Sequence, residues 1–358
     1  MPEQINEYYE SHQKLPFIST QGQQQLQQAK VSVIGAGGLG CPSLQYLAGC
    51  GIGHIDIVDF DTVDVSNLHR QVLYNLQDVG KPKATTAVEK LSAYNPYISL
   101  KAYRLFVDES NVLSLLQNNN VIVDCTDNFQ VRYLINDACV LLDKPLVYGA
   151  IHKNEGHITV FNYHQSPTLR CLFPESDVND NIQGCADIGA YNITTGVIGL
   201  MMANEVIKII LQHPDVLASK LIQVDVLTGN FMQIKYASCL EGRQKSIERF
   251  QSSTSIEISP ASLSQKIKES EIFSLFDVRE EDERLRFNIG GTHIPLQKFF
   301  EESIQIPPTE TIIVYCQRGE RSLRAVKFLK QKGFANAFSL KGGMDLWQKL
   351  SPKSHYIK

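Results

Sequence analysis

The sequence has no strong excess of charge of either sign, no dense set of cysteines and no long uninterrupted apolar run. Its 34 Lys and Arg residues against 38 Asp and Glu give a formal net charge of −4, so the charge balance gives no reason to expect nucleic acid or a membrane as partner. Eight cysteines in 358 residues are too few for a disulfide framework. The N-terminal residues MPEQINE lack a basic region followed by an apolar stretch, and we therefore expect no signal peptide and a cytoplasmic protein.

The longest apolar stretch, residues 196–211, is interrupted by Asn204, Glu205 and Lys208. With these polar side chains it is expected to form a buried or amphipathic core helix and not a membrane span. Hydrophobic residues make up 43% of the chain and charged residues 20%, which is ordinary for a globular protein. The length suffices for two domains, each with its own core.

Short apolar runs alternate with segments of helical periodicity in the N-terminal part of the chain. The runs at residues 31–34, 55–58 and 121–125 are typical of buried strands. Strands that alternate with helices build a doubly wound, mostly parallel sheet. We therefore expect an α/β fold of the Rossmann type, with residues 196–211 as a long core helix.

A polar, serine-rich stretch follows at residues 240–255, and its composition is typical of a linker. Beyond it, strand-like runs at residues 272–276, 311–315 and 337–340 are again separated by helical spacing, which predicts a second, smaller α/β domain. The predicted organisation is an N-terminal domain over residues 1–242, a linker over residues 243–256 and a C-terminal domain over residues 257–358.

A glycine-rich loop stands directly after the first predicted strand. Gly35, Gly37 and Gly40 satisfy the pattern Gly-x-Gly-x-x-Gly, which makes a tight turn, lets a phosphate approach the backbone and points a helix N-terminus at its charge. Asp59 ends the next strand, near the spacing expected for an acid that binds ribose hydroxyls. These residues alone would indicate an NAD-dependent oxidoreductase.

The residues beyond Asp59 favour a triphosphate instead. They bring amide and basic side chains together: Asn67, Arg70, Gln71 and Lys83. Arginine makes bidentate contacts with phosphate and lysine supplies a point charge, whereas hydride transfer needs neither. Asp127, after the strand at residues 121–125, has a carboxylate that could hold Mg²⁺ beside the phosphates. The alternative is that these side chains are solvated surface charges and that Asp127 caps a helix. That interpretation could explain any one of the residues, but it explains poorly why all of them occur in this order.

On these motifs, residues 21–236 resemble the MoeB/ThiF family of ubiquitin-activating-like adenylyltransferases. The resemblance implies that the domain uses ATP and Mg²⁺ to adenylate the C-terminal glycine of a ubiquitin-like sulfur carrier of the ThiS/MoaD type. It also implies a homodimer, with Arg70 and Lys83 as catalytic residues and Asp127 as the magnesium ligand. The implied ATP-binding residues are Gly35, Gly37, Gly38, Gly40, Asp59, Asp61, Asn67, Arg70, Gln71, Lys83 and Asp127.

Cys185 lies in a polar, glycine-containing segment just ahead of the predicted long helix. Its position resembles that of the family's active-site cysteine, which attacks the adenylate or forms a persulfide link with the carrier. A free cysteine is more often a small buried hydrophobe. The polar surroundings favour the catalytic role here.

The chain departs from the family pattern at a zinc site that many members build from two Cys-x-x-Cys pairs. Thr168 and Gly242 stand where one ligand of each pair is expected, which leaves Cys171 and Cys239. Two thiolates do not complete a tetrahedral zinc site. We therefore expect no zinc, and a packing role for both cysteines.

A second departure concerns the family's N-terminal arginine, which reaches into the ATP site of the partner subunit. His12 stands at the matching position, and Lys14 follows it. Imidazole is shorter than arginine and mostly neutral at pH 7, so Lys14 is a candidate substitute. Without a substitute, ATP turnover would be weak.

Cys316 follows the predicted strand at residues 311–315 and precedes an amphipathic segment. Loop N–H groups and the positive end of a helix would converge on its sulfur, and Arg318 and Arg321 add positive charge, all of which stabilise a thiolate or a persulfide. Four residues separate Cys316 from Arg321, one fewer than in cysteine phosphatases, so the smaller loop suits sulfur. The predicted persulfide loop comprises Arg318, Gly319, Arg321 and Ser322.

The tail resembles a rhodanese domain over almost its entire length. The matching segments are residues 276–283, 290–295, 316–322 and 340–347. Within the first of them, Asp277 and Arg279 are predicted to form an internal salt bridge that supports the fold.

The two resemblances imply one reaction sequence. The N-terminal domain would activate the carrier with ATP, Cys316 would deliver persulfide sulfur, and Cys185 would resolve the intermediate, leaving a carrier thiocarboxylate for molybdopterin or thiamine biosynthesis. Expected partners are a carrier ending in Gly-Gly and a cysteine desulfurase or another sulfur donor. Two alternatives remain open: a weakly active scaffold that docks a carrier to the rhodanese, and an NAD or FAD oxidoreductase with a rhodanese appendage, against which Arg70 and Lys83 count.

Overall fold

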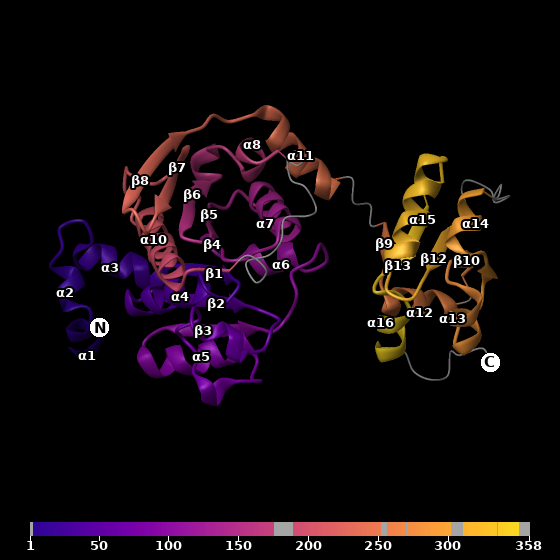
Figure 1. The fold of residues 1–358 in the computed structure, drawn as a ribbon, viewed down its shortest axis with the longest axis horizontal. Helices are drawn as coiled ribbons and strands as arrows, with labels where there is room; N and C mark the ends of the chain where they lie inside the picture. The colour runs from indigo at the N-terminus through magenta and orange to yellow at the C-terminus, as the bar shows by residue number, and fades with distance from the viewer. Residues whose placement is uncertain are drawn as a thin grey trace. The chain divides into compact units, whose positions relative to one another are not determined.

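The computed structural model describes residues 3–174, 189–251, 256–269, 271–301, 311–334 and 336–350. The chain divides into two compact units, residues 1–250 and residues 251–358, each with its own sheet (Figure 1).

The first unit contains an eight-stranded sheet in the order β3-β2-β1-β4-β5-β6-β7-β8. Strands β1 to β5 run parallel, and β6, β7 and β8 are added antiparallel. The predicted doubly wound, mostly parallel sheet is thus confirmed. The strands are β1 (Lys30–Ile34), β2 (His54–Val58), β3 (Ser99–Tyr103), β4 (Val121–Asp124), β5 (Leu146–His152), β6 (Glu155–Phe161), β7 (Lys220–Asp225) and β8 (Asn230–Lys235).

The strand order reverses at β1, which lies between β2 and β4. The chain passes from β1 outward through β2 to β3, then crosses to the other side of β1 with β4 and β5. Ile34, the last residue of β1, pairs with Val58 of β2 and Asp124 of β4, so three strands end together. A reversal of this kind leaves a crevice at the carboxyl ends of the strands, where open α/β sheets bind ligands.

Helices cover both faces of this sheet because alternate residues of a strand point to opposite faces. Val121 and Val123 of β4 belong to one core, and Ile122 belongs to the other. The first core is covered by α3 (Ser19–Gln28), α4 (Gly40–Gly49), α5 (Lys83–Tyr94) and α10 (Asn192–Ile210), and the second by α6 (Val112–Leu116), α7 (Phe129–Leu141) and α8 (Leu169–Leu172). The short elements are α1 (Glu3–Tyr8), α2 (Glu10–Gln13), η1 (Val65–Asn67), η2 (Leu76–Asp78) and η3 (Tyr163–Gln165).

Helix α10 is the long apolar helix expected from the sequence. Among the described residues it is the one helix whose length and composition would allow it to cross a membrane, and half of it is buried inside the unit. It packs against α4, β5 and β6 (Figure 1). A core helix passes the same test of length and composition, and these contacts are those of a core helix.

The structure differs from the predicted linker over residues 243–256, because residues up to Gln251 form the helix α11 (Leu240–Gln251). Ser246 of this helix is fully buried, and its hydroxyl donates to Asp137 Oδ1 of α7 at 2.7 Å. Arg249 Nη1 lies 3.4 Å from Asp137 Oδ2. Polar side chains that the composition assigned to solvent therefore hold α11 against the first unit.

Asp137 is the centre of this contact and is itself fully buried. Arg170 of α8 donates to both of its carboxylate oxygens, Nε to Oδ1 at 2.8 Å and Nη2 to Oδ2 at 2.7 Å. Arginine and carboxylate thus form a bidentate pair away from water. One side chain of α7 therefore binds both α8 and α11.

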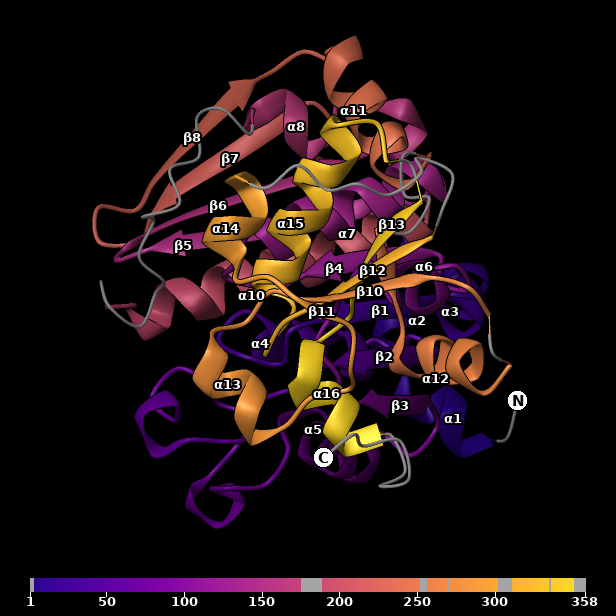
Figure 2. The same cartoon turned by 90° about the vertical axis from the view of Figure 1, so that its right-hand side faces the viewer.

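The second unit is a five-stranded parallel sheet in the order β11-β10-β12-β13-β9. Ile312 and Val314 of β12 pack into one core, and Ile313 and Tyr315 pack into the other. Helices α14 and α15 lie side by side over the first core (Figure 2). The elements are β9 (Glu257–Ile258), α12 (Pro260–Lys268), β10 (Ser274–Asp277), α13 (Glu281–Arg286), β11 (Thr292–His293), α14 (Leu296–Glu301), β12 (Ile312–Tyr315), α15 (Glu320–Gln331), β13 (Ala337–Leu340) and α16 (Gly343–Leu350).

Substitution Asp137→Asn is expected to destabilise the first unit by about 3 kcal/mol, because it leaves two arginines beside a neutral group in a buried site. Urea unfolding followed by circular dichroism measures the loss. Trp347, the one tryptophan of the chain, lies in the second unit, so its fluorescence transition should keep its midpoint.

Glu241→Gln is the matched control, since Glu241 forms an exposed ion pair with Lys245 on the same helix. Exposed pairs contribute little to stability, and no measurable shift is expected. An Asp137→Asn protein as stable as this control would contradict the anchoring role of Asp137.

Candidate functional site

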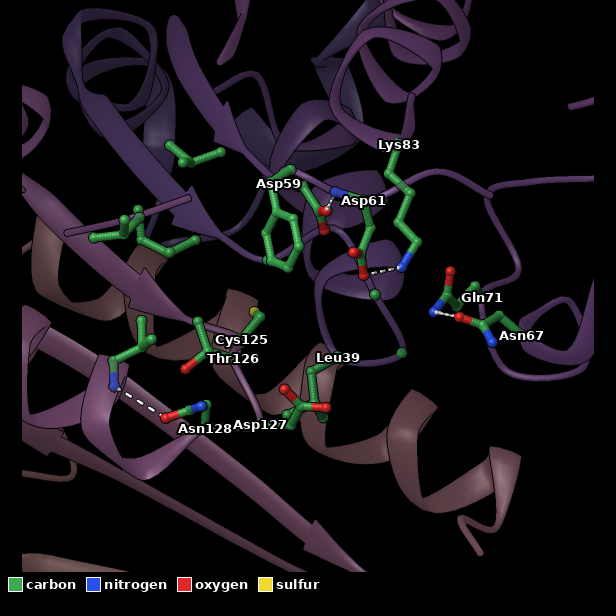
Figure 3. Close-up of a pocket in the computed structure, with 18 of the residues that line it drawn as sticks. Leu39, Asp59, Asp61, Asn67, Gln71, Lys83, Cys125, Thr126, Asp127 and Asn128 are labelled. Carbon is green, nitrogen blue, oxygen red and sulfur yellow. Dashed lines mark hydrogen bonds and ion pairs between the residues drawn. The ribbon is translucent and has the colours of Figure 1, made fainter. Parts of the chain in front are cut away.

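A cavity of about 350 Å³ opens where β1, β2 and β4 end, at the crevice produced by the strand reversal (Figure 3). All but one of the predicted nucleotide-binding residues line it, contributed by the loops after the three strands and by the start of α5. The lining members are Gly35, Gly37, Gly38, Asp59, Asp61, Asn67, Arg70, Gln71, Lys83 and Asp127. The remaining residue, Gly40, begins α4.

The glycines bring the start of α4 against the end of β1. A Cβ atom at Gly40 would lie 2.0 Å from the carbonyl oxygen of Gly35, a distance that no side chain tolerates. Gly35 itself has a φ of +95°, which favours glycine. The first turn of α4 can therefore approach the cavity, with the positive end of the helix close to the place of an anion.

Asp59 is fixed by the backbone on both of its oxygens. Oδ2 accepts from the N–H of Ala36 at 2.7 Å, and Oδ1 accepts from the N–H of Asp61 at 2.8 Å. Burial raises the pKa of the Asp59 carboxyl, although these hydrogen bonds and the charge of Lys83 act in the opposite direction. The side chain is thus held rigidly at the place expected for a ribose-binding acid.

Lys83 extends into the cavity and pairs with Asp61. Its Nζ lies 3.0 Å from Asp61 Oδ2, and its side chain is only 6% exposed. Figure 3 shows this contact on the same side of the cavity as Asp59. A buried ammonium group with one carboxylate partner can exchange that partner for a phosphate without moving far.

Asn67 and Gln71 lie together at the edge of the cavity (Figure 3). Gln71 Nε2 donates to Asn67 Oδ1 at 3.0 Å, while Gln71 Oε1 is buried and finds no hydrogen-bond partner among the described residues. Arg70 Nη1 donates to the Ser66 carbonyl at 3.3 Å. Gln71 Oε1 is therefore an acceptor left for a ligand.

Asp127 belongs to the loop after β4, across the cavity from Asp61 in Figure 3. No cluster of three or more His, Cys, Asp or Glu side chains suited to a metal occurs among the described residues. Mg²⁺ keeps few protein ligands and takes most of its oxygens from phosphates and water. A single carboxylate such as Asp127 fits that kind of site.

An aromatic pair that no sequence motif predicted also lines the cavity. The rings of Phe60 and Phe106 meet edge to face with centroids 5.2 Å apart, both side chains are about half exposed, and both line the cavity. Phe60 stands next to Asp59 and could have been noticed. Phe106 follows β3, a strand without a buried apolar run, so no local pattern marked it.

Besides Gly40, His12 and Lys14 are not among the residues that line this cavity. Cys185 lies outside the described residues. His12 is in α2, where its Nδ1 is buried without a hydrogen-bond partner among the described residues. Lys14 forms an exposed ion pair with Glu10 at 2.7 Å. A role for His12 or Lys14 in a partner subunit stays a prediction.

The four positions matching the family's zinc ligands lie together. Thr168 Oγ1 is 3.4 Å from Cys171 Sγ, the N–H of Cys239 donates to Cys171 Sγ at 3.1 Å, and a Cβ at Gly242 would lie 2.7 Å from Cys239 Sγ. Two thiols and a hydroxyl do not supply the four nitrogen or sulfur donors of structural zinc. Both cysteines are partly exposed, which differs from the packing role expected for them.

Cys316 directly follows β12, and its side chain is buried in the loop before α15. The N–H of Gly319 donates to its sulfur at 3.1 Å, and the Ser322 hydroxyl donates at 3.4 Å. Gly319 has a φ of +100° and precedes the first turn of α15. Two of the four predicted persulfide-loop residues thus contact the sulfur directly.

The predicted arginines of this loop are used differently from what we expected. Arg321 donates to both oxygens of Glu283, at 2.7 and 2.6 Å. The hydrogen bonds from Arg321 lower the pKa of Glu283 to about 2. Arg318 is largely exposed, with its Nε 3.8 Å from Asp345. Glu283 lies 38 residues before Arg321 in the sequence, at the end of the rhodanese-like segment 276–283, but no role was predicted for it.

The predicted salt bridge between Asp277 and Arg279 is confirmed. Arg279 Nη2 lies 2.7 Å from Asp277 Oδ2, and both side chains are almost fully buried. Arg279 also donates to the Gln317 side chain next to Cys316, at 3.3 Å. This pair therefore supports the loop after Cys316 through Gln317 and does not contact the sulfur.

Comparisons with known proteins agree with both halves of this arrangement. Residues 9–242 match the ThiF family, and residues 259–350 match the rhodanese-like domain. A sulfur carrier protein adenylyltransferase of Thermus thermophilus is 42% identical over 231 residues, which is 63% of this chain and 85% of that protein. The probable adenylyltransferase/sulfurtransferase MoeZ of Mycobacterium tuberculosis is 34% identical over 362 residues, 95% of this chain and 92% of that protein.

Solved structures support the fold of the first unit. The crystal structure of E. coli MccB with ATP has a TM-score of 0.55 and 23% sequence identity, and the match covers 61% of this chain and 67% of that one. At this identity the likeness shows the fold alone. The similarity to MoeZ extends over both parts of this chain, and the chain belongs to the ThiF family, with a rhodanese-like domain in its C-terminal part.

Proposed function

We propose that this protein is an ATP-dependent adenylyltransferase and sulfurtransferase that converts the C-terminal glycine of a ubiquitin-like sulfur carrier into a thiocarboxylate. The observation that carries the proposal is that one chain has both a cavity lined by the predicted nucleotide-binding residues, with Lys83 buried inside it, and a cysteine loop whose donors converge on sulfur. The Thermus relative is named for adenylyl transfer to a sulfur carrier, and MoeZ is named for both adenylyl and sulfur transfer.

In the proposed first step the cavity binds ATP. The N–H groups after β1 and the side chains of Arg70 and Lys83 hold the phosphates, and Asp59 binds the ribose. Asp127 would hold Mg²⁺, which neutralises charge on the phosphates. The terminal carboxylate of the carrier attacks the α-phosphorus, pyrophosphate leaves, and a mixed anhydride of carrier and AMP remains.

In the second step a sulfur donor, such as a cysteine desulfurase, has loaded Cys316 with a persulfide. The Gly319 N–H and the Ser322 hydroxyl stabilise its anionic form. The terminal sulfur attacks the acyl carbon of the anhydride, and AMP leaves. The Cys185 thiolate then attacks the inner sulfur of the acyl disulfide, which releases the thiocarboxylate and leaves a disulfide between Cys185 and Cys316 for a thiol reductant.

The pathway, location and assembly form part of the same proposal. The thiocarboxylate would supply sulfur for molybdopterin or thiamine biosynthesis in the cytoplasm, and the protein would act as a homodimer without zinc, nucleic acid or membrane. The N-terminal helices of one subunit would bring His12 or Lys14 to the ATP site of the other. A scaffold with a weak ATP site is the second candidate, favoured by His12. Membership of the ThiF family removes the reason to propose an oxidoreductase.

The proposal predicts that Lys83→Ala lowers carrier-dependent exchange of pyrophosphate into ATP by roughly 100-fold, because a buried cation at a developing anion is lost. Lys90→Ala is the matched control. Lys90 lies on the same helix and pairs with Asp78 outside the cavity, so exchange should persist. The assay uses a small carrier ending in Gly-Gly, and tight carrier binding without any exchange would favour the scaffold.

A second prediction separates the two sites. Cys316→Ala should retain pyrophosphate exchange and abolish thiocarboxylate formation, since the adenylation cavity lies in the first unit and Cys316 in the second. Mass spectrometry of the carrier, with persulfide supplied by a cysteine desulfurase, measures the product. If exchange is lost together with the thiocarboxylate, the two steps are not divided in this way.

A third prediction concerns the ion pair of Glu283 and Arg321. Because the folded pKa of Glu283 is about 2 and its ordinary value is 4.5, the stabilisation is fully present above about 4.5 and disappears as the pH falls to about 2. Acid unfolding followed by Trp347 fluorescence should show this loss of stability in the wild type. In Glu283→Gln it should be absent at every pH, and an unchanged acid profile would refute the pairing.

A further inference from the structure

Two thiols from distant parts of the chain meet on the first unit. Cys171 lies in α8 and Cys239 directly precedes α11, 68 residues later. Cys171 Sγ accepts from the N–H of Cys239 at 3.1 Å and lies 3.6 Å from the carbonyl oxygen of the same residue. A hydrogen bond also joins the two thiols. Both residues are partly exposed, so reagents in solution can reach them.

The surroundings keep the two sulfurs in contact. Arg170, next to Cys171, and Ser246 of α11 both bind the buried carboxylate of Asp137, so α8 and α11 are held at a fixed spacing. Gly242 leaves room for the second sulfur, because a Cβ there would lie 2.7 Å from Cys239 Sγ. The two helices therefore hold the thiols close to each other.

The two thiols are chemically unequal. Burial raises the pKa of Cys171, but hydrogen bonds from the Thr168 hydroxyl, the Cys239 thiol and the backbone outweigh it, and the net pKa is lowered. Burial and the contact with Cys171 raise the pKa of Cys239. Burial also raises the pKa of Cys41 to about 12 and that of Cys50 to about 11. Cys171 is thus set apart as the more reactive thiol of the pair.

We propose that Cys171 and Cys239 form a redox-active dithiol, which low-molecular-weight disulfides such as glutathione disulfide oxidise to an intramolecular disulfide. The Cys171 thiolate attacks one sulfur of the small disulfide and expels one thiolate. Cys239 then loses its proton, attacks the Cys171 sulfur of the mixed disulfide and expels the second thiolate. Two cysteine thiols are oxidised and one small disulfide is reduced to two thiols. The new bond ties α8 to the start of α11.

The sequence allows a direct test on the full chain. After incubation with glutathione disulfide and blocking of free thiols, cleavage on the carboxyl side of glutamate gives fragments Gly156–Glu175 and Val206–Glu241, each with a single cysteine, while Cys185 falls in fragment 176–205. We expect the first two fragments to be joined, with two hydrogens lost, and to separate on treatment with dithiothreitol. Fragments that stay separate, or a bond from Cys171 to fragment 176–205, would overturn the proposal.

Variants test the order of attack. In Cys239→Ser, glutathione should accumulate on fragment 156–175, and faster than on fragment 206–241 in Cys171→Ser, because hydrogen bonds lower the pKa of the Cys171 thiol and the contact with Cys171 raises that of Cys239. Equal rates would contradict Cys171 as the attacking thiol. Cys50→Ser is the matched control and should form the disulfide like the wild type. The readout is independent of adenylation and sulfur transfer, so it stands or fails apart from the proposed function.

Discussion

The approach of the first turn of α4 to the end of β1 is the contact on which the nucleotide site depends. The space between Gly35 and Gly40 has no room for a side chain, and any larger residue would push the helix away from the crevice. The same helix is fixed from behind, since the Ser43 hydroxyl donates to the carbonyl of Gly199 in α10 at 2.8 Å. A Cβ at Gly199 would lie 2.6 Å from the Leu39 carbonyl. The core helix and the phosphate-binding turn therefore depend on each other.

Sequence patterns predicted the elements that depend on residues close together in the chain. Apolar runs predicted β1, β2 and β4 because these strands are buried on both faces, and the residues directly after them line the cavity. Contacts between distant segments were missed. Phe106 follows the edge strand β3 and lines the cavity. Glu283 pairs with Arg321, 38 residues later in the sequence. Ser246 of α11 donates a hydrogen bond to Asp137 of α7, which holds this helix against the first unit. Composition alone could not reveal these pairings.

In the predicted persulfide loop, the groups that contact Cys316 Sγ are neutral hydrogen-bond donors. Glu283 takes up the guanidinium of Arg321, so the charge of that arginine is largely compensated before it can act on Cys316. The Ser339 hydroxyl donates to Ser322 at 2.8 Å, and the Ser322 hydroxyl has two acceptors, the Gly319 carbonyl at 2.9 Å and the sulfur at 3.4 Å. A chain of hydrogen bonds strengthens each member. An anionic sulfur is therefore supported by hydroxyls, an N–H group and the start of α15, while Arg318 remains exposed to solvent.

The contact between α8 and α11 at the edge of the first unit bears on our expectation that this chain binds no zinc. Structural zinc contributes folding free energy because it joins segments that are distant in sequence. Here Asp137 joins the same two helices through Arg170 and Ser246, inside the protein and with every bond short. With the helices held by that carboxylate, Thr168 and Gly242 can stand at ligand positions without loss of the contact. The thiols of Cys171 and Cys239 lie close together at this edge, and the redox role that we propose for them needs no metal.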